Sequence, residues 1–158
     1  MRSLLLNLLV ALVWLLLQAQ PSIGALLFGW VIGFGLLALF RPILDSGDYV
    51  RRMLAGLWFG VVFAREFLVA CLQLIRLILF VRRDRLRPAF LIFDVADLTR
   101  VEILLLSHVV TLTPGTCTVD VSSDFKRLYL HALDCPDPEQ VRADIERTFK
   151  CGILAFTR

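Results

Sequence analysis

The sequence predicts a membrane protein with an α-helical N-terminal part followed by a small α+β domain. Of its 158 residues, 58% are apolar, which is well above the share in ordinary soluble domains. The excess lies before Val81, whereas residues 88–158 combine alternating apolar patterns with ten acidic and seven basic side chains. We therefore expect three parts: a transmembrane helical hairpin over residues 1–40, a charged loop, long helix and basic run over 41–87, and a cytoplasmic α+β domain over 88–158.

Two apolar runs make up the predicted hairpin, Ser3 to Leu17 and Ile23 to Phe40. Pro21 and Gly24 lie between them and favour a turn. At about 1.5 Å per residue the two helices would be roughly 22 and 27 Å long, which is short against a hydrocarbon core of about 30 Å. We therefore expect two short spanning helices that need a thinned bilayer or partner helices. A cleavable signal peptide fits less well, because the second apolar run begins at once and no clean A-x-A site precedes it.

The second apolar run contains a G-x-x-x-G pair, Gly29 and Gly33. Small residues at this spacing let the backbone of another helix approach closely. The pair is therefore a candidate surface for contact with partner helices.

The third apolar segment, Leu54 to Val81, carries four polar side chains: Arg65, Glu66, Gln73 and Arg76. As a helix it would be about 42 Å long. Arg65 and Arg76 are eleven residues apart and Glu66 and Gln73 seven, so at about 100° per residue the four form one polar stripe. The segment either crosses the bilayer with this polar stripe turned to partners or water, or lies amphipathically in the interface.

The positions of the arginines favour the interfacial placement and two spans, while three spans stay possible. If only the hairpin crosses, the basic residues of the membrane part share one side, and the loop between the spans is uncharged. These residues are Arg2, Arg41, Arg51, Arg52, Arg82, Arg83, Arg85 and Arg87. Glu66 is then the one membrane-proximal carboxylate. It is either neutralised by Arg65 or borders an ion route shared with partner subunits.

Residues 88–158 predict a βαββα order. The expected elements are a strand at 88–95, a helix at 98–110, strands at 117–122 and 128–133 and a helix at 138–155. Asp137 is the expected cap of the last helix, with Pro138 at its first position and Glu139 in its first turn.

The stretch "TLTPGT" at 111–116 joins the first helix of this domain to a strand. Pro114 cannot continue a helix and Gly115 can adopt positive φ. The hydroxyls of Thr111, Thr113 and Thr116 can bond backbone groups left open at the helix end. A structural turn explains these residue types without any chemistry.

No enzyme, metal site or cofactor is predicted. The sequence contains no phosphate-binding loop, nucleophile elbow or dinucleotide fingerprint. His108 and His131 lack metal-ligand spacing. The four cysteines form no C-x-x-C pair, and we expect them to be reduced, small buried hydrophobes: Cys71, Cys117, Cys135 and Cys151.

The block "TLTPGTCTVDVSSDFKRLYLHALD" at 111–134, preceded by two short apolar helices and followed by an acidic helix, resembles the E subunit of the Mrp-type multisubunit cation/proton antiporters. The resemblance covers nearly the whole chain, and its motif turn is Thr113, Pro114, Gly115 and Thr116. It implies an accessory subunit, in a bacterial cell membrane complex of six or seven proteins that exchanges sodium for protons, whose large partners hold the ion machinery. The resemblance implies no catalytic residue in this chain.

A stand-alone, membrane-tethered sensor or adaptor of small ligands is the alternative, because a βαββα domain alone does not define a function.

Overall fold

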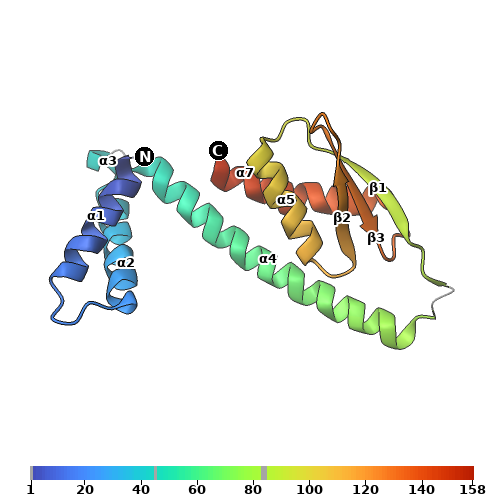
Figure 1. Ribbon diagram of the computed structural model, residues 1–158, viewed down its shortest axis with the longest axis horizontal. Coiled ribbons are helices and arrows are strands. Elements are labelled where there is room, and N and C mark those ends of the chain that lie inside the picture. Colours follow the sequence, from blue (N-terminus) through green and yellow to red (C-terminus); the bar gives the residue numbers. More distant parts are fainter. Residues whose placement is uncertain (1, 45, 83–84) are drawn as a thin grey trace. The chain divides into compact units, whose positions relative to one another are not determined.

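The computed structural model describes residues 2–44, 46–82 and 85–158. The chain folds as two units, Met1–Leu54 and Ala55–Arg158. Figure 1 shows the helices of the first unit and the sheet with its helices in the second. Arg83, which belongs to the predicted basic run, lies outside the described residues.

The first unit contains α1 (Arg2–Leu16), α2 (Ile23–Leu39), the short α3 (Arg41–Leu44) and the start of α4 (Gly47–Phe80). Helices α1 and α2 lie side by side as a hairpin (Figure 1). The Ser22 hydroxyl caps α2 by accepting a hydrogen bond from the Ala25 amide at 3.1 Å.

The hairpin buries small and polar residues and turns its large apolar side chains outward. Its buried positions are Asn7, Ala11, Gly29, Gly33 and Leu37. Most of its leucines are exposed, including Leu5, Leu9 and Leu16 in α1. Within the described parts of the chain, no helix has the length and apolar character needed to cross a membrane. The membrane placement expected from the sequence is therefore not confirmed.

Helix α4 begins at Gly47 rather than at Leu54, so the expected start was wrong. The prediction placed the start of the helix at the start of the apolar run. The polar first turns are also helical, and Asp48 lies in the first turn, where a negative charge interacts favourably with the helix dipole. The helix continues without interruption for 34 residues.

The second unit contains a three-stranded antiparallel sheet in the order β1-β3-β2. Its strands are β1 (Ala89–Asp94), β2 (Thr116–Val121) and β3 (Arg127–Ala132). Along β1, Leu91 and Phe93 are buried while Phe90 and Ile92 are exposed, which is the alternation expected of a sheet covered on one face. A register shift between Thr118 and Asp120 leaves Val119 unpaired, as in a β-bulge.

Helices cover the buried face of the sheet: α5 (Arg100–Leu112), and a continuous C-terminal run of α6 (Pro138–Asp144), the π-helical η2 (Ile145–Lys150) and α7 (Cys151–Thr157). Asp137 caps α6 by accepting from the amides of Glu139 and Gln140, as predicted. The apolar core combines both layers and consists of Leu91, Phe93, Val95, Ile103, Leu106, Val110, Leu128, Leu130, Ala132, Cys135, Ile145, Phe149 and Ile153.

A buried carboxylate, Glu102, ties the start of α5 to the end of α7. It forms a capping box with Thr99 and accepts from the Thr157 hydroxyl at 2.7 Å and from Nη2 of Arg158 at 3.1 Å. The Arg158 guanidinium, followed by the Thr99 and Thr157 donors, outweighs burial and lowers the pKa of Glu102 from 4.5 to about 2.

A second ion pair lies at the end of η2. The buried Lys150 pairs with Asp97 at 2.9 Å and Glu146 at 3.2 Å. Burial disfavours the charge of Lys150, but the hydrogen bonds to these two carboxylates outweigh it and raise the pKa of the lysine.

Candidate functional site

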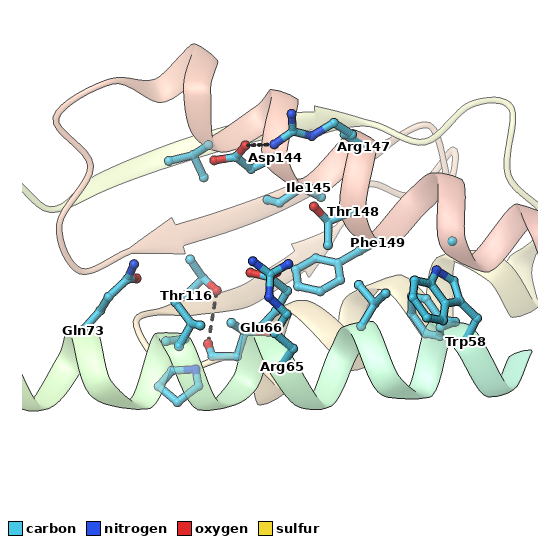
Figure 2. Close-up of a pocket in the computed structure, with 18 of the residues that line it drawn as sticks. Trp58, Arg65, Glu66, Gln73, Thr116, Asp144, Ile145, Arg147, Thr148 and Phe149 are labelled. Carbon is cyan, nitrogen blue, oxygen red and sulfur yellow. Dashed lines mark hydrogen bonds and ion pairs between the residues drawn. The ribbon is translucent and has the colours of Figure 1, made fainter.

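A cavity of about 780 Å³ lies in the second unit between α4 and the sheet domain (Figure 2). Three segments line it: the middle of α4, the turn that follows α5, and the C-terminal run from α6 to α7. Two of the features that the sequence singled out, the polar stripe and the motif turn, contribute to this one cavity.

Helix α4 packs against the domain through residues that recur every three or four positions. Phe59 and Phe63 contact the apolar core, and the Phe59 ring lies 5.5 Å from that of Phe156 in α7. Gly152 makes this approach possible, because a Cβ built there would overlap the Phe59 ring. The helical period of α4 thus turns one face toward the domain and fixes which of its side chains reach the cavity.

Three members of the polar stripe line the cavity: Arg65, Glu66 and Gln73. Nη1 of Arg65 lies 3.3 Å from Oε1 of Glu66, and the Glu66 side chain is 31% exposed. Arg76 is exposed and does not belong to the described lining. The four residues of the polar stripe therefore do not share one environment, because three line the cavity and Arg76 lies outside the described lining. Glu66 lies on the face of α4 that points to the domain (Figure 2).

The motif turn supplies the opposite wall through Thr113, Pro114 and Thr116. Gly115 has φ 97°, so the positive φ expected there is confirmed. The Thr113 hydroxyl donates to the Val109 carbonyl at 2.9 Å and that of Thr116 to the Val110 carbonyl at 3.0 Å.

The Thr111 hydroxyl completes the turn by accepting from the Thr118 amide at 3.1 Å. The predicted bonds to the end of the helix are thus confirmed for Thr113 and Thr116, whereas Thr111 bonds an amide of β2 instead. What the sequence did not predict is that the turn faces α4.

The C-terminal run contributes Asp144, Arg147, Thr148 and Phe149 to the cavity. Nη2 of Arg147 lies 3.3 Å from Oδ1 of Asp144, a second ion pair in the lining. These residues were missed by sequence reasoning. Their only signal was the three-residue spacing of two opposite charges on a helix, which is common on solvated faces.

The two glycines of the G-x-x-x-G pair lie in the first unit and face α1 of the same chain. A Cβ on Gly29 would lie 2.8 Å from Cβ of Trp14, and one on Gly33 would overlap Oδ1 of Asn7. Asn7 in turn donates to the Tyr49 hydroxyl at 2.8 Å. The pair therefore serves a helix contact inside the chain, and its role as a partner contact stays a prediction.

Titratable groups elsewhere do not converge on a metal centre. Within the described residues, no group of three or more His, Cys, Asp or Glu side chains could hold a metal ion. Nδ1 of His108 lies 2.7 Å from the Leu104 carbonyl, and the His131 ring packs edge-on against Phe90 at 5.0 Å.

The cysteines have free thiols, as expected, but they are not uniformly buried. Cys135 belongs to the core, Cys71 and Cys117 are half-buried, and Cys151 is exposed. The expectation of burial was wrong for Cys151, because α7 points this side chain away from the core that Ile153 enters.

A helical hairpin with outward apolar side chains, joined through a long helix to a small α+β domain, is typical of one component of a larger assembly. A family profile described as "Na+/H+ ion antiporter subunit" matches residues 7–155. The chain is 32% identical over 156 residues to the E subunit of the Na(+)/H(+) antiporter of Alkalihalophilus pseudofirmus, covering 99% of this chain and 98% of the relative. It is 30% identical to the corresponding antiporter protein of Bacillus subtilis over the same shares. The chain belongs to the family of Na+/H+ antiporter E subunits.

Two solved structures share the fold. One is from the Mrp complex of Dietzia sp. DQ12-45-1b, with a TM-score of 0.50 and 24% identity, covering 64% of this chain and 94% of that chain. The other is from the membrane-bound sulfane sulfur reductase, an archaeal respiratory membrane complex, with a TM-score of 0.58 and 24% identity, covering 96% of both chains.

Proposed function

We propose that the chain is an accessory subunit of a multisubunit sodium/proton antiporter, and that it acts by supporting assembly of the complex. Family membership over nearly the full length supports the identity of the complex. The observation that carries the accessory role is the outward apolar surface of the hairpin, which other membrane components must cover.

The hairpin of α1 and α2 inserts into the bilayer among helices of partner subunits. Its packing supports this placement, since close contact through glycine and alanine is how helices associate where no hydrophobic effect acts between them. Partner helices also compensate for its short helices of 15 and 17 residues. The sheet domain lies on the cytoplasmic side, as the arginines before it favour.

Helix α4 lies in the membrane interface in this proposal. The side of α4 that does not pack on the domain exposes large apolar residues at helical spacing: Leu54, Leu57, Val61, Leu68, Leu72, Ile75 and Leu79. An amphipathic helix of this kind buries its apolar face at the level of the headgroups. Glu66 faces the opposite way, into the cavity, and this favours a structural ion pair with Arg65 over a place in the ion route.

A pull-down of the tagged full chain in mild detergent, from cells that express the whole complex, tests the proposal. We expect the large antiporter proteins to accompany the chain, and cells lacking the chain to contain less assembled complex. Recovery of the chain without any antiporter protein would instead favour a stand-alone sensor or adaptor.

Topology is tested with a thiol reagent that does not cross membranes. Cys151 is the suitable target because its side chain is exposed, whereas Cys135 is buried. With the other cysteines replaced by serine or alanine, we expect Cys151 to be labelled in lysed cells and protected in intact cells. Equal labelling in both would place the domain on the outer side.

A further inference from the structure

The cavity between α4 and the sheet domain separates apolar from polar lining along the axis of α4. Its first part is lined by Ala55, Trp58 and Val62 from α4, with Gly152 and Ala155 from α7. Its second part holds the charged and hydroxyl side chains together with the apolar Val69, Ala70, Pro114, Val141 and Ile145. Figure 2 shows Trp58 and Gln73 at the two ends, which are roughly 22 Å apart at about 1.5 Å per residue. The cavity therefore has an apolar end and a second, mixed end that carries all of its charged groups, called the polar end below.

The polar end carries balanced charge. Its two guanidinium groups and two carboxylates form the pairs Arg65–Glu66 and Arg147–Asp144, each at 3.3 Å. Each pair uses one terminal nitrogen of its arginine, and a guanidinium has five N–H donors, so both can also bind a phosphate. A cationic group would share Glu66 with Arg65 and Asp144 with both Arg147 and Nε2 of Gln140, which donates to Oδ1 of Asp144 at 3.1 Å. A ligand with one positive and one negative charge would match this end without adding net charge.

We propose that this cavity binds a zwitterionic single-chain amphiphile, with a phosphate and an ammonium group in its head. The phosphate lies against Arg65 and Arg147, the ammonium against Glu66 and Asp144, and the acyl chain against Trp58, Val62 and the α7 wall. Arginine is well suited to the planar, bidentate recognition of phosphate. The volume of about 780 Å³ lies within the roughly 300–1,000 Å³ of small-molecule sites.

A polypeptide segment from a partner protein is the rival occupant. A polypeptide carries a backbone donor and acceptor at nearly every residue, whereas the described lining around Trp58 offers no charged or hydroxyl side chain. The lining therefore favours an amphiphile. The site is a property of the chain itself and does not rest on the proposed role in an antiporter.

Native mass spectrometry of the full chain, released from a non-ionic detergent, tests the site by titration with lysophosphatidylethanolamine. We expect one bound equivalent. The double variant Arg65→Gln with Arg147→Gln should bind about tenfold more weakly or worse, since it removes two charge-assisted contacts. The matched control is Arg76→Gln, which removes an arginine of the same helix outside the described lining and should bind as the unaltered chain does.

A second variant keeps the test independent of the arginines. Ala155→Trp fills the apolar end without changing charge, and Ala155 is exposed in the lining. We expect it to reduce binding of the lysolipid and to leave binding of free phosphoethanolamine unchanged. Free phosphoethanolamine bound as tightly as the lysolipid would support the zwitterion site and make its source a soluble molecule.

Three results would overturn the inference. One is the absence of a bound equivalent in the unaltered chain, and another is equal retention by the double variant. The third is preferential binding of the anionic lysophosphatidylglycerol. A photoreactive group placed at Thr148 also distinguishes the rival, because crosslinks to a partner protein in the purified complex would identify a docked protein segment instead.

Discussion

In the hairpin of α1 and α2 most of the described buried positions hold small or polar residues, Asn7, Ala11, Gly29 and Gly33, beside the single leucine Leu37. The sheet domain instead buries a continuous core of mainly large apolar side chains, with the charged Glu102 and Lys150 at its edge.

The outward surfaces differ as well, because the hairpin exposes mainly leucines, whereas the C-terminal helices of the domain expose mainly charged and polar residues. The sheet and α5 still expose some large apolar side chains, such as Phe90 and Val101. The difference indicates that the internal packing of each unit is stabilised by a different interaction. The hairpin is stabilised by close approach of its two helix backbones, whereas the domain is stabilised by removing apolar side chains from water.

The strongest test of this difference is to fill the closest contact of the hairpin. Gly33→Leu places side-chain atoms where Oδ1 of Asn7 lies, and we expect it to abolish most of the assembled complex, because neither helix can move apart without losing the contact. The matched control is Gly35→Leu on the same helix, since no described atom lies within 4 Å of a Cβ built there. Complex abundance after tagged purification measures the effect. Equal abundance for both variants would show that close packing does not hold the hairpin.

In the domain, the corresponding test is to remove the buried carboxylate. Glu102→Gln should lower the free energy of unfolding by about 3 kcal/mol, since it removes a buried negative charge to which Arg158 and the α5 cap donate. Hydrogen exchange of the domain in the full chain measures this loss. Unchanged exchange of the domain in this variant would contradict a stabilising role of Glu102.

The pH dependence of stability follows from the same group. Its pKa falls from 4.5 in the unfolded chain to about 2 in the fold, so Glu102 stabilises the domain above pH 4.5 and loses this contribution as the pH falls toward 2. We expect the Gln variant to lose less stability than the unaltered chain between these pH values. If the free energy of unfolding of both proteins fell equally between these pH values, Glu102 would not be the group responsible.

A smaller effect is expected at the motif turn. Gly115 has φ 97°, and no described atom lies within 4 Å of a Cβ built at this position. A substitution would therefore lower stability through the backbone conformation and not through a steric clash. Gly115→Val should lower the free energy of unfolding by about 1–3 kcal/mol, and Gly115→Asn by less, because asparagine tolerates positive φ better. Thermal unfolding of the two variants measures the difference, and equal melting temperatures would show that the turn does not depend on φ.

The smallest effect is expected for Glu66→Gln. The carboxylate pairs with its exposed neighbour Arg65, and such pairs contribute about 0–1 kcal/mol. We therefore expect unchanged assembly and unchanged sodium-dependent proton movement in vesicles. Reduced sodium/proton exchange with normal assembly of the complex would instead indicate that Glu66 borders the ion route.

The sequence predicted the elements that depend on local patterns. Apolar alternation located the strands, and Pro114, Gly115 and Asp137 marked helix ends, because caps and turns are decided by neighbouring residues. It did not predict that the motif turn faces Glu66 and Gln73, since these segments meet only in the folded chain. The sequence likewise identified Gly29 and Gly33 as a contact surface but did not predict that α1 of the same chain lies against it, because spacing does not identify the covering helix. Contact of this pair with a partner stays a prediction.

The π-helical segment η2 sets the rotational phase of the C-terminal helix. Ile145, Phe149 and Ile153 all enter the core although they are spaced by four, a spacing that advances around an α-helix by about 40° at each step. In η2 the Cys151 amide bonds the Glu146 carbonyl five residues back, and this wider turn rotates less per residue, which offsets the advance. The extra residue in this turn thus lets one helix match the sheet and α4 in the same register.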